Sequence, residues 1–315
     1  MKRRIAVLMT CHNRREKTLA CLQGLSHQNL PPEVGIQVYL VDDGSTDGTA
    51  AAVKADFPQV KIIPGDGNLY WSGGMRLAFG MAMKEGYDYY LWLNDDTNLF
   101  PHALENLLAT EVKLRNVGFS LCIVIGSVCD PENGKLTYGG CKRREWRLLP
   151  LHFSRVEPGT EPTRCETFEG NCVLIPHDVA AKRVGNIDPA FMHQLGDTDY
   201  GLRALRDGVT NWIAPGFVGT CSSNQVADTW MDWNLPLRVR LKKMAYTKGV
   251  NPGPWKAFVR RHGGPLWPLE WLWPYINLFL THYLRRELSA FNPNNRFPGR
   301  QDHLGRWFSP DARDR

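Results

Sequence analysis

Short apolar runs recur along the first two thirds of the chain, and each run ends in small, polar or acidic residues. The first four runs are residues 5–9, 38–41, 60–63 and 89–93. Apolar runs of this length, of which the third is interrupted by Lys61, are typical of strands buried on both faces of a parallel sheet. Segments with helical spacing lie between them, such as the one that carries Leu19, Leu22 and Leu25. This alternation predicts an α/β fold with a mostly parallel, Rossmann-like central sheet flanked by helices.

The pattern continues less regularly in the second half of the chain. We expect strands at residues 122–128, 172–175 and 211–215, with residues 136–140 returning as a hairpin after a turn. A helix is predicted at residues 176–184, and another ends near Gly208.

Polar side chains follow directly after three of the predicted strands. They are Thr10, Asn13 and Arg14 after the first, Asp42 and Asp43 after the second, and Asn94, Asp95 and Asp96 after the fourth. Because the carboxyl ends of parallel strands form the ligand-binding edge of open α/β sheets, we expect these side chains in one site. Carboxylates there suit Mg²⁺ or Mn²⁺ bound to a substrate diphosphate. The alternative is a solvated turn in which Asp95 or Asp96 caps the next helix.

A second acidic cluster precedes the helix that ends near Gly208. Asp197 and Asp199 lie two residues apart, and Arg203 follows Asp199 at helical i,i+4 spacing. This spacing predicts a structural ion pair between Asp199 and Arg203. Asp197 is then either a helix cap or a carboxylate available for chemistry.

Composition and cysteine usage indicate an ordinary globular protein. The 315 residues are 43% hydrophobic and 22% charged. The eight cysteines form no CxxC pair and no disulfide framework, so we expect reduced thiols and a cytoplasmic protein. The apolar run at residues 5–9 follows basic residues but is too short for a signal peptide.

Positive charge and tryptophan concentrate in the C-terminal part. Residues 236–315 contain 15 Lys and Arg against 5 Asp and Glu, within a chain of net charge +6. Pro274 is expected to open a helix whose apolar face carries Ile276, Phe279, Leu280, Tyr283 and Leu284.

This C-terminal face has two open interpretations. Charged and polar interruptions such as Glu270 argue against a transmembrane span. In the first interpretation, residues 255–288 contact a membrane surface peripherally. In the second, the face packs on the catalytic domain or across a homodimer. We expect a helical appendage at residues 226–291 and a loosely ordered tail at 292–315.

Six motifs in this order resemble the large family 2 of inverting nucleotide-sugar glycosyltransferases, in particular its rhamnosyltransferase-like bacterial members. The motifs are TCHNR, VDDGSTDGT, GGMR, LNDDT, GNCVLIP and GDTDYGLRALRDG. The resemblance implies a GT-A catalytic domain at residues 1–225. Within it, residues 1–110 would bind the nucleotide sugar and residues 111–225 the acceptor.

The resemblance also implies roles for individual residues. Asp96 would be the main ligand of Mg²⁺ or Mn²⁺, with Asp95 helping, and Asp197 would be the base that deprotonates the acceptor hydroxyl. The donor-binding set would be Thr10, Asn13, Arg14, Asp42, Asp43, Gly73, Arg76 and Asn94, with Asp42 and Asp43 reading the base and ribose and Arg76 facing the diphosphate or sugar.

The chain departs from the family pattern in three places. Asn94 stands where stricter members have Asp, and Gly196 stands where many have Glu. Residues 217–224 lack the His that completes the metal shell in many relatives, and His193 is an alternative ligand.

The function that these features predict is inverting transfer of a single sugar from a UDP- or dTDP-sugar to a saccharide acceptor. The acceptor would be lipid-linked, in bacterial cell-surface polysaccharide synthesis at the inner face of the membrane, with no nucleic-acid partner. The alternatives are a metal-dependent nucleotidyltransferase and a non-enzymatic carbohydrate- or nucleic-acid-binding scaffold. The prediction requires Asp96 and Asp197 to converge on one cleft.

Overall fold

The computed structural model describes residues 3–144, 151–246 and 249–291, with side chains of the last helix described as far as Leu284. The chain forms two compact units. The first unit comprises residues 1–142 and 155–223, and the second comprises residues 143–154 and 224–315. The tail expected at residues 292–315 lies outside the described residues.

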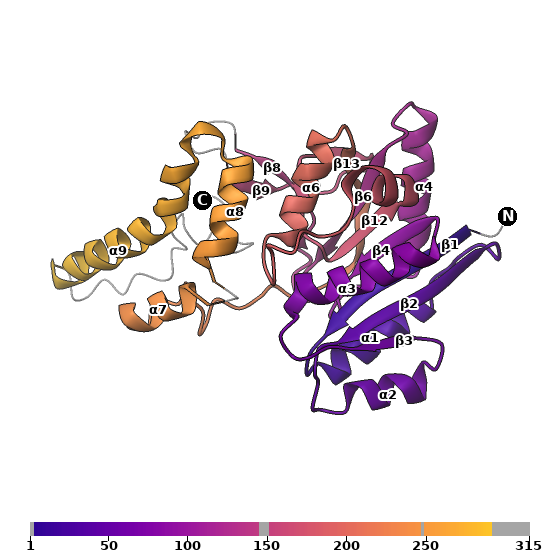
Figure 1. Cartoon of the computed structure of the whole chain (residues 1–315), viewed down its shortest axis with the longest axis horizontal. Coiled ribbons are helices and arrows are strands. Elements are labelled where there is room, and N and C mark those ends of the chain that lie inside the picture. The colour runs from indigo at the N-terminus through magenta and orange to yellow at the C-terminus, as the bar shows by residue number, and fades with distance from the viewer. Residues whose placement is uncertain (1–2, 145–150, 247–248, 292–315) are drawn as a thin grey trace. The chain divides into compact units, whose positions relative to one another are not determined.

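A large mixed sheet forms the centre of the first unit (Figure 1). Its strand order is β10-β13-β6-β12-β4-β1-β2-β3, with β5 on β13 and β7 on β6. The strands are β1 (Arg3–Cys11), β2 (Val34–Asp42), β3 (Lys61–Pro64), β4 (Tyr89–Leu93), β5 (Asn98–Leu99), β6 (Cys122–Cys129), β7 (Leu136–Tyr138), β10 (Thr163–Cys165), β12 (Cys172–Pro176) and β13 (Thr210–Thr220). Three short strands lie elsewhere, namely β8 (Gly140–Arg143), β9 (Phe153–Arg155) and β11 (Thr167–Phe168).

The direction of the strands confirms the predicted mostly parallel sheet. β1 is parallel to both β2 and β4, β2 to β3, and β13 to β6. β12 is antiparallel to its neighbours β4 and β6, so β6 and β4 run the same way. The hairpin expected after residue 128 is present as the antiparallel pair β6 and β7. β13 is longer than the predicted final strand.

Helices cover both faces of this sheet and alternate residues of β1 divide the core between them. Ile5, Val7 and Met9 belong to a cluster with α1 (Arg15–Ser26), α2 (Thr49–Asp56) and α4 (Ala103–Asn116). Ala6 and Leu8 belong to a cluster with α3 (Tyr70–Glu85), α5 (His177–Val179), the π-helical turn η1 (Ala180–Val184) and α6 (Gly196–Arg206). β1 and β4 are fully buried beyond their first residues, as their apolar runs predict.

The second unit contains three α-helices within the described residues. They are α7 (Leu237–Met244), α8 (Pro252–His262) and α9 (Trp267–Phe291), with the 3₁₀ turn η2 (Gly264–Leu266) before α9. The prediction that Pro274 opens the last helix is wrong, because the helix begins at Trp267 and Pro274 lies inside it. Pro268 occupies the first turn instead, where the missing N–H has no cost. Within the described ranges, no helix combines the length and apolarity needed to span a bilayer.

The predicted ion pair between Asp199 and Arg203 is confirmed, and it lies in the core of the first unit. Arg203 Nε donates to Asp199 Oδ2 at 2.8 Å, and the Asp199 side chain is fully buried. The same guanidinium donates to the carbonyls of Val184 and Asn186 at 2.6 and 2.9 Å. The pair therefore fixes α6 to the end of η1 and to the residues that follow it.

We expect Asp199→Ala to lower the free energy of unfolding by about 3 kcal/mol, because it leaves the buried Arg203 charge without its carboxylate. Urea denaturation followed by circular dichroism measures this change. Asp178→Ala is the matched control, since its i,i+4 pair with Lys182 is exposed and should contribute under about 0.5 kcal/mol. Equal effects of the two substitutions would contradict a structural role for the buried pair.

Candidate active site

Two loops at the carboxyl edge of the sheet hold each other in place. Asn13, after β1, has a φ of 51°. Its side-chain Oδ1 accepts the N–H of Thr46 at 2.7 Å, and its own N–H donates to Ser45 Oγ at 2.9 Å. The N–H of Arg15 donates to Asp47 Oδ2 at 3.0 Å. The loop after β1 is therefore fastened to the loop after β2, which fixes the direction in which Arg14 leaves the backbone.

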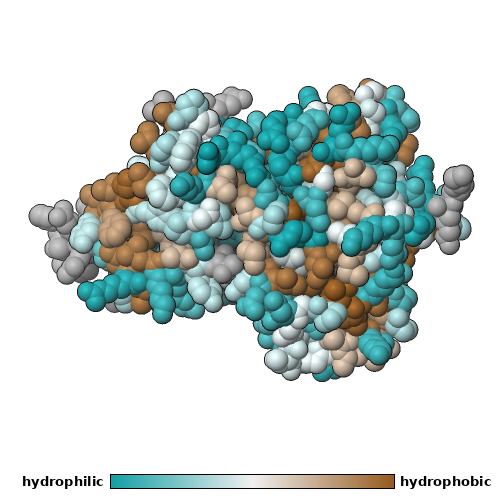
Figure 2. Space-filling view, in the orientation of Figure 1, coloured by the Kyte–Doolittle hydropathy of each residue, from teal (hydrophilic) through white to brown (hydrophobic). Residues whose placement is uncertain are grey.

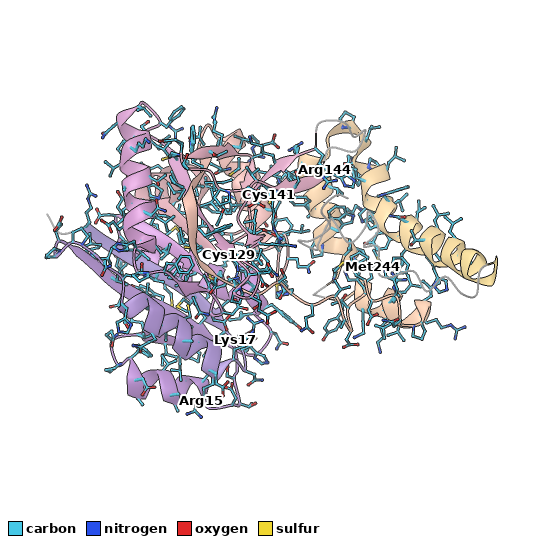
Figure 3. All side chains as sticks on the ribbon, turned by 180° about the vertical axis from the view of Figure 1, so that it is seen from behind. Arg15, Lys17, Cys129, Cys141, Arg144 and Met244 are labelled. Atoms are coloured by element: carbon cyan, nitrogen blue, oxygen red, sulfur yellow. The ribbon has the colours of Figure 1, made fainter. Side chains whose placement is uncertain are left out.

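Arg14 joins the two carboxylates that follow β4. Its Nη1 donates to Asp95 Oδ1 at 3.0 Å and to Asp96 Oδ2 at 2.9 Å. Burial raises the pKa of Asp95 to about 6, and the positive charges of Arg14 and Lys17 oppose that rise. The polar groups predicted after the first and the fourth strands thus meet directly. Figure 3 labels Lys17 near the start of α1.

Asp42 and Asp43 bind backbone groups of the neighbouring loops. Asp42 Oδ1 accepts the N–H of Ser45 at 3.0 Å. Asp43 accepts the N–H of Gly67 on Oδ1 at 2.8 Å and that of Tyr70 on Oδ2 at 2.9 Å. Both carboxylates are buried, at 7% and 3% exposure. In this structure they shape the rim of the site, a role that the sequence did not reveal.

The start of α3 packs closely against β1 and against the loop before Asp197. A Cβ on Gly74 would lie 2.2 Å from Thr10 Oγ1, so only glycine allows this approach. The N–H of Gly73 donates to Met192 O at 3.2 Å, and Arg76 Nη1 donates to Phe191 O at 3.4 Å. Arg76 and Gly73 thereby connect α3 to residues 191–192, which precede the second acidic motif.

Trp71 connects the end of β4 to Asp197. Its indole Nε1 donates to Asn94 Oδ1 at 2.6 Å. The far side of its ring lies 2.5 Å from where a Cβ on Gly170 would be, and Asp197 Cβ lies 3.4 Å from that same point. Asp197 Oδ2 in turn accepts the N–H of Gly170 at 2.9 Å. One indole therefore spans the interval between the two acidic motifs, which lie about a hundred residues apart in sequence.

Asp197 is held as a partly buried carboxylate at the start of α6. Besides Gly170, the N–H of Thr198 donates to its Oδ1 at 2.8 Å. Burial raises the pKa of Asp197 to about 6, while these two N–H groups oppose the rise. Gly196 has a physical reason to lack a side chain, since a Cβ there would lie 2.5 Å from Ser72 Oγ and 3.1 Å from Ile187 Cγ2.

Cys221 lies beside Asp96, in the segment where the family pattern led us to look for His. Its Sγ is 3.6 Å from Asp96 Oδ1, and its N–H donates to Cys129 O at 2.9 Å at the end of β6, where Figure 3 labels Cys129. Burial and the Asp96 charge raise the pKa of Cys221 to about 12, so the thiol is neutral. Sequence reasoning missed this residue because a single cysteine has no distinctive spacing.

Positive backbone φ angles mark three of the loops that form the site. Asn13, Tyr70 and Leu195 have φ of 51°, 52° and 71°. For tyrosine and leucine this conformation is strained, and such strain often marks functional sites. Each of the three immediately precedes a residue used above, namely Arg14, Trp71 and Gly196.

Comparison with known proteins identifies the family. The sequence model described as "Glycosyl transferase family 2" matches residues 6–171, which is more than half of the chain. The chain belongs to glycosyl transferase family 2. One relative of this family 2 chain is the N-acetylglucosaminyl-diphospho-decaprenol L-rhamnosyltransferase of Mycobacterium tuberculosis, 24% identical over 216 residues. That alignment covers 60% of this chain and 66% of the relative, which is just under two thirds of its length.

Solved structures show the same fold. The mannosyltransferase PcManGT from Pyrobaculum calidifontis, in complex with GDP-Man and Mn²⁺, matches with a TM-score of 0.53 at 15% identity, over 93% of this chain and 76% of that one. S. aureus TarS 1-349 with UDP matches with a TM-score of 0.51 at 11% identity, over 82% and 70%. The family 2 chain therefore has the GT-A glycosyltransferase fold that its sequence predicted.

The acidic end of β4 in this family 2 chain fits a hard divalent cation. Asp95 Oδ2 is buried and has no hydrogen-bond partner among the described residues. With the oxygens of Asp96 it forms a donor set of the kind that Mg²⁺ and Mn²⁺ prefer. The described residues contain no cluster of three ligating His, Cys, Asp or Glu side chains. Asp95 and Asp96 would then be the two protein ligands, and such cations commonly complete their shell with substrate phosphates and water.

The packing of Trp71 on Gly170 generates a stability test. We expect Gly170→Ala to lower the free energy of unfolding by about 1–3 kcal/mol, because the new methyl group would overlap the rigid indole. In a Trp71→Ala background the same change should cost less by at least about 1 kcal/mol. Denaturant titration of the four proteins of this double-mutant cycle measures the coupling.

Gly159→Ala is the control for that cycle. The nearest atoms to a Cβ at this loop position lie 3.8 Å away, so its effect should stay within about 0.5 kcal/mol. Additive effects of Gly170→Ala and Trp71→Ala would show that the indole does not pack as described.

Proposed function

We propose that this chain is a metal-dependent inverting glycosyltransferase that moves a single sugar from a UDP- or dTDP-sugar to a saccharide acceptor. The observation that carries the proposal is the Trp71 connection, which joins Asn94 beside the Asp95–Asp96 pair to Gly170 and Asp197. A transfer enzyme needs charge compensation for its leaving diphosphate and a base for its acceptor in the same site. Membership of glycosyl transferase family 2 supports the same reaction class.

Residues 1–110 form the donor side in this proposal. Thr10, Asn13, Arg14, Asp42 and Asp43 lie in or beside the two fastened loops, and they would bind the nucleotide. Mg²⁺ or Mn²⁺ held by Asp96 and Asp95 would neutralise negative charge on the leaving diphosphate.

Arg14, Asn94 and the start of α3 complete the donor side. Arg14 is half exposed and already faces both carboxylates, so its guanidinium also suits the diphosphate. Asn94, Gly73 and Arg76 would line the sugar and diphosphate positions, since all three lie next to Trp71 or to the loop that precedes Asp197.

Residues 111–225 form the acceptor side, and Asp197 acts as the base. Its carboxylate accepts the proton of the acceptor hydroxyl as that oxygen attacks the anomeric carbon. The bond from the anomeric carbon to the diphosphate oxygen breaks on the opposite side, which inverts the configuration. The N–H groups of Gly170 and Thr198 hold the carboxylate in position for this transfer.

The relatives support the proposed substrate classes. The mycobacterial relative is named for transfer of L-rhamnose to N-acetylglucosaminyl-diphospho-decaprenol, a lipid-linked saccharide. TarS was solved with UDP and PcManGT with GDP-Man and Mn²⁺. We therefore propose a lipid-linked acceptor, a role in bacterial cell-surface polysaccharide synthesis, and a cytoplasmic enzyme that works at the inner face of the membrane.

Product analysis separates this proposal from its alternatives. Incubation with UDP- and dTDP-sugars, a lipid-linked saccharide and Mn²⁺ should release nucleoside diphosphate. A nucleotidyltransferase would release pyrophosphate, although residues 10–14 lack the glycine-rich loop that such enzymes usually carry. A binding scaffold would release neither product, and salt-sensitive oligonucleotide binding would favour it.

Replacing the base should stop the reaction and leave donor binding intact. We expect Asp197→Asn to lower kcat by a factor of about 10²–10⁴, because the amide cannot accept the proton. Release of nucleoside diphosphate measures turnover, and titration with UDP or dTDP measures binding. Asp207→Asn, at the other end of α6, is the matched control and should retain full turnover. Unchanged turnover in Asp197→Asn would reject the assignment.

The pH dependence should report the same carboxylate. Asp197 acts only when ionised, and burial raises its pKa to about 6. The value of kcat/KM should therefore rise with pH through a midpoint near 6 and then level off. Measuring kcat/KM between about pH 4.5 and about pH 8, in steps of about half a pH unit, checks this. A profile that is flat from pH 5 upward would show that another group removes the proton.

The cation site can be tested by thermal stabilisation. UDP or dTDP with Mn²⁺, at saturating concentration, should raise Tm by about 5 °C through binding to the folded state. Asp96→Ala should abolish the Mn²⁺-dependent part of that shift, and Asp56→Ala, an exposed carboxylate at the end of α2, should not. Full activity in excess chelator would argue against the cation.

A further inference from the structure

The outer face of α9 and the turn before it is almost entirely apolar. Sixteen large hydrophobic side chains are exposed among the described residues, and eight of them lie between residues 266 and 284. They are Leu266, Leu269, Leu272, Ile276, Phe279, Leu280, Tyr283 and Leu284, each 41–58% exposed. We call this set the α9 face. Figure 2 shows it as a brown band along the helix. An exposed apolar patch of this kind marks an interaction surface.

The opposite side of α9 is fixed within its own unit. Trp271 Nε1 donates to Pro252 O at 3.2 Å, and the Tyr275 hydroxyl donates to Val250 O at 2.8 Å. Glu270 also lies on this inner side, fully buried, and accepts the N–H of Leu151 at 3.1 Å. The single carboxylate of the described α9 side chains is therefore inside and the aliphatic residues are outside, the reverse of a water-facing helix.

Two occupants suit such an apolar face, a second copy of the chain and a lipid surface, and charge decides between them. Residues 236–291 contain ten Lys and Arg and two Asp and Glu, and one of those acids is the buried Glu270. Arg238, Lys242, Lys256 and Arg260 are exposed. A second copy of the chain would bring this positive charge against itself. An anionic lipid surface attracts it, and basic residues beside an apolar helix face are typical of interfacial helices.

We propose that the α9 face docks onto an anionic lipid bilayer, with the helix lying in the plane of the interface. The apolar side chains enter the boundary between headgroups and acyl chains, and the exposed Lys and Arg of this unit contact lipid phosphates. The chain is then held on the membrane without spanning it, which agrees with the absence of a spanning helix among the described residues.

Vesicle sedimentation tests the proposal with the full chain. We expect the protein to pellet with vesicles of phosphatidylcholine mixed with phosphatidylglycerol, and far less with phosphatidylcholine alone. The triple variant Leu272→Gln, Ile276→Gln and Leu280→Gln should bind the mixed vesicles at least about tenfold more weakly, because the buried apolar area is lost. Met81→Gln, Val117→Gln and Leu205→Gln, which replace exposed apolar residues of the first unit, form the matched control and should bind like wild type.

A charge variant provides a second, independent arm. Lys256→Glu with Arg260→Glu keeps the α9 face and should weaken binding to the mixed vesicles, as should high salt. It also decides the question if the triple variant fails to fold, as judged by circular dichroism. Asp197→Asn should bind vesicles like wild type, so loss of transfer activity and loss of docking are distinguishable.

Two outcomes would overturn the proposal. One is wild-type protein that stays in the supernatant with the mixed vesicles. The other is a wild-type dimer in sedimentation velocity that becomes monomeric in the triple variant while vesicle binding stays unchanged, since the α9 face would then be an interface between copies of this chain.

Discussion

Two carboxylates side by side at the end of a buried strand are the constraint on which the site depends. β4 lies in the middle of the sheet and its five residues are buried, so Asp95 and Asp96 follow it with little access to water. A neighbouring cation stabilises like charges in such a place. In this structure Arg14 supplies it, reaching both carboxylates with one nitrogen. The loops after β1 and β2 are fastened to each other, and this holds Arg14 where its side chain reaches both carboxylates.

The same end of β4 is tied to the second acidic motif by an aromatic side chain rather than by charge. Trp71 has a hydrogen-bond donor at one end and a wide apolar ring at the other. The donor binds Asn94 and the ring covers Gly170, whose N–H holds Asp197. A rigid spacer of this kind fixes the distance between two polar groups without adding charge between them. Glycine at position 170 is the structural requirement that this arrangement imposes.

The second unit distributes its apolar side chains differently from the first unit. In the first unit apolar side chains are directed into two cores on either side of the sheet. In α9 a carboxylate is buried and leucines are exposed. The apolar face of such a helix is removed from water only when an apolar phase or a partner covers it. The proposed docking onto lipid would place the enzyme beside the lipid-linked acceptors proposed above.

The sequence by itself determined the α/β fold, the order of its strands along the chain and the family. Short apolar runs bounded by polar residues are typical of strands buried on both faces, and polar residues at their ends gather at one edge because parallel strands end there. Spacing was also enough for the pair between Asp199 and Arg203, since helical neighbours at i,i+4 are fixed by local geometry. Spacing did not predict correctly where α9 begins. Pro274 does not open this helix, because its start depends on packing against α8 and not on proline alone.

Only the tertiary structure decided which strand-end groups meet each other. Arg14 and Asp95 are 81 residues apart, and Cys221 and Asp96 are 125 apart, so no local pattern could pair them. The role of Trp71 was equally hidden, because it depends on a glycine 99 positions away that makes room for the ring. Contacts of this kind follow from strand order and loop geometry in three dimensions, whereas the periodicity of a sequence records only which side of its own element each residue faces.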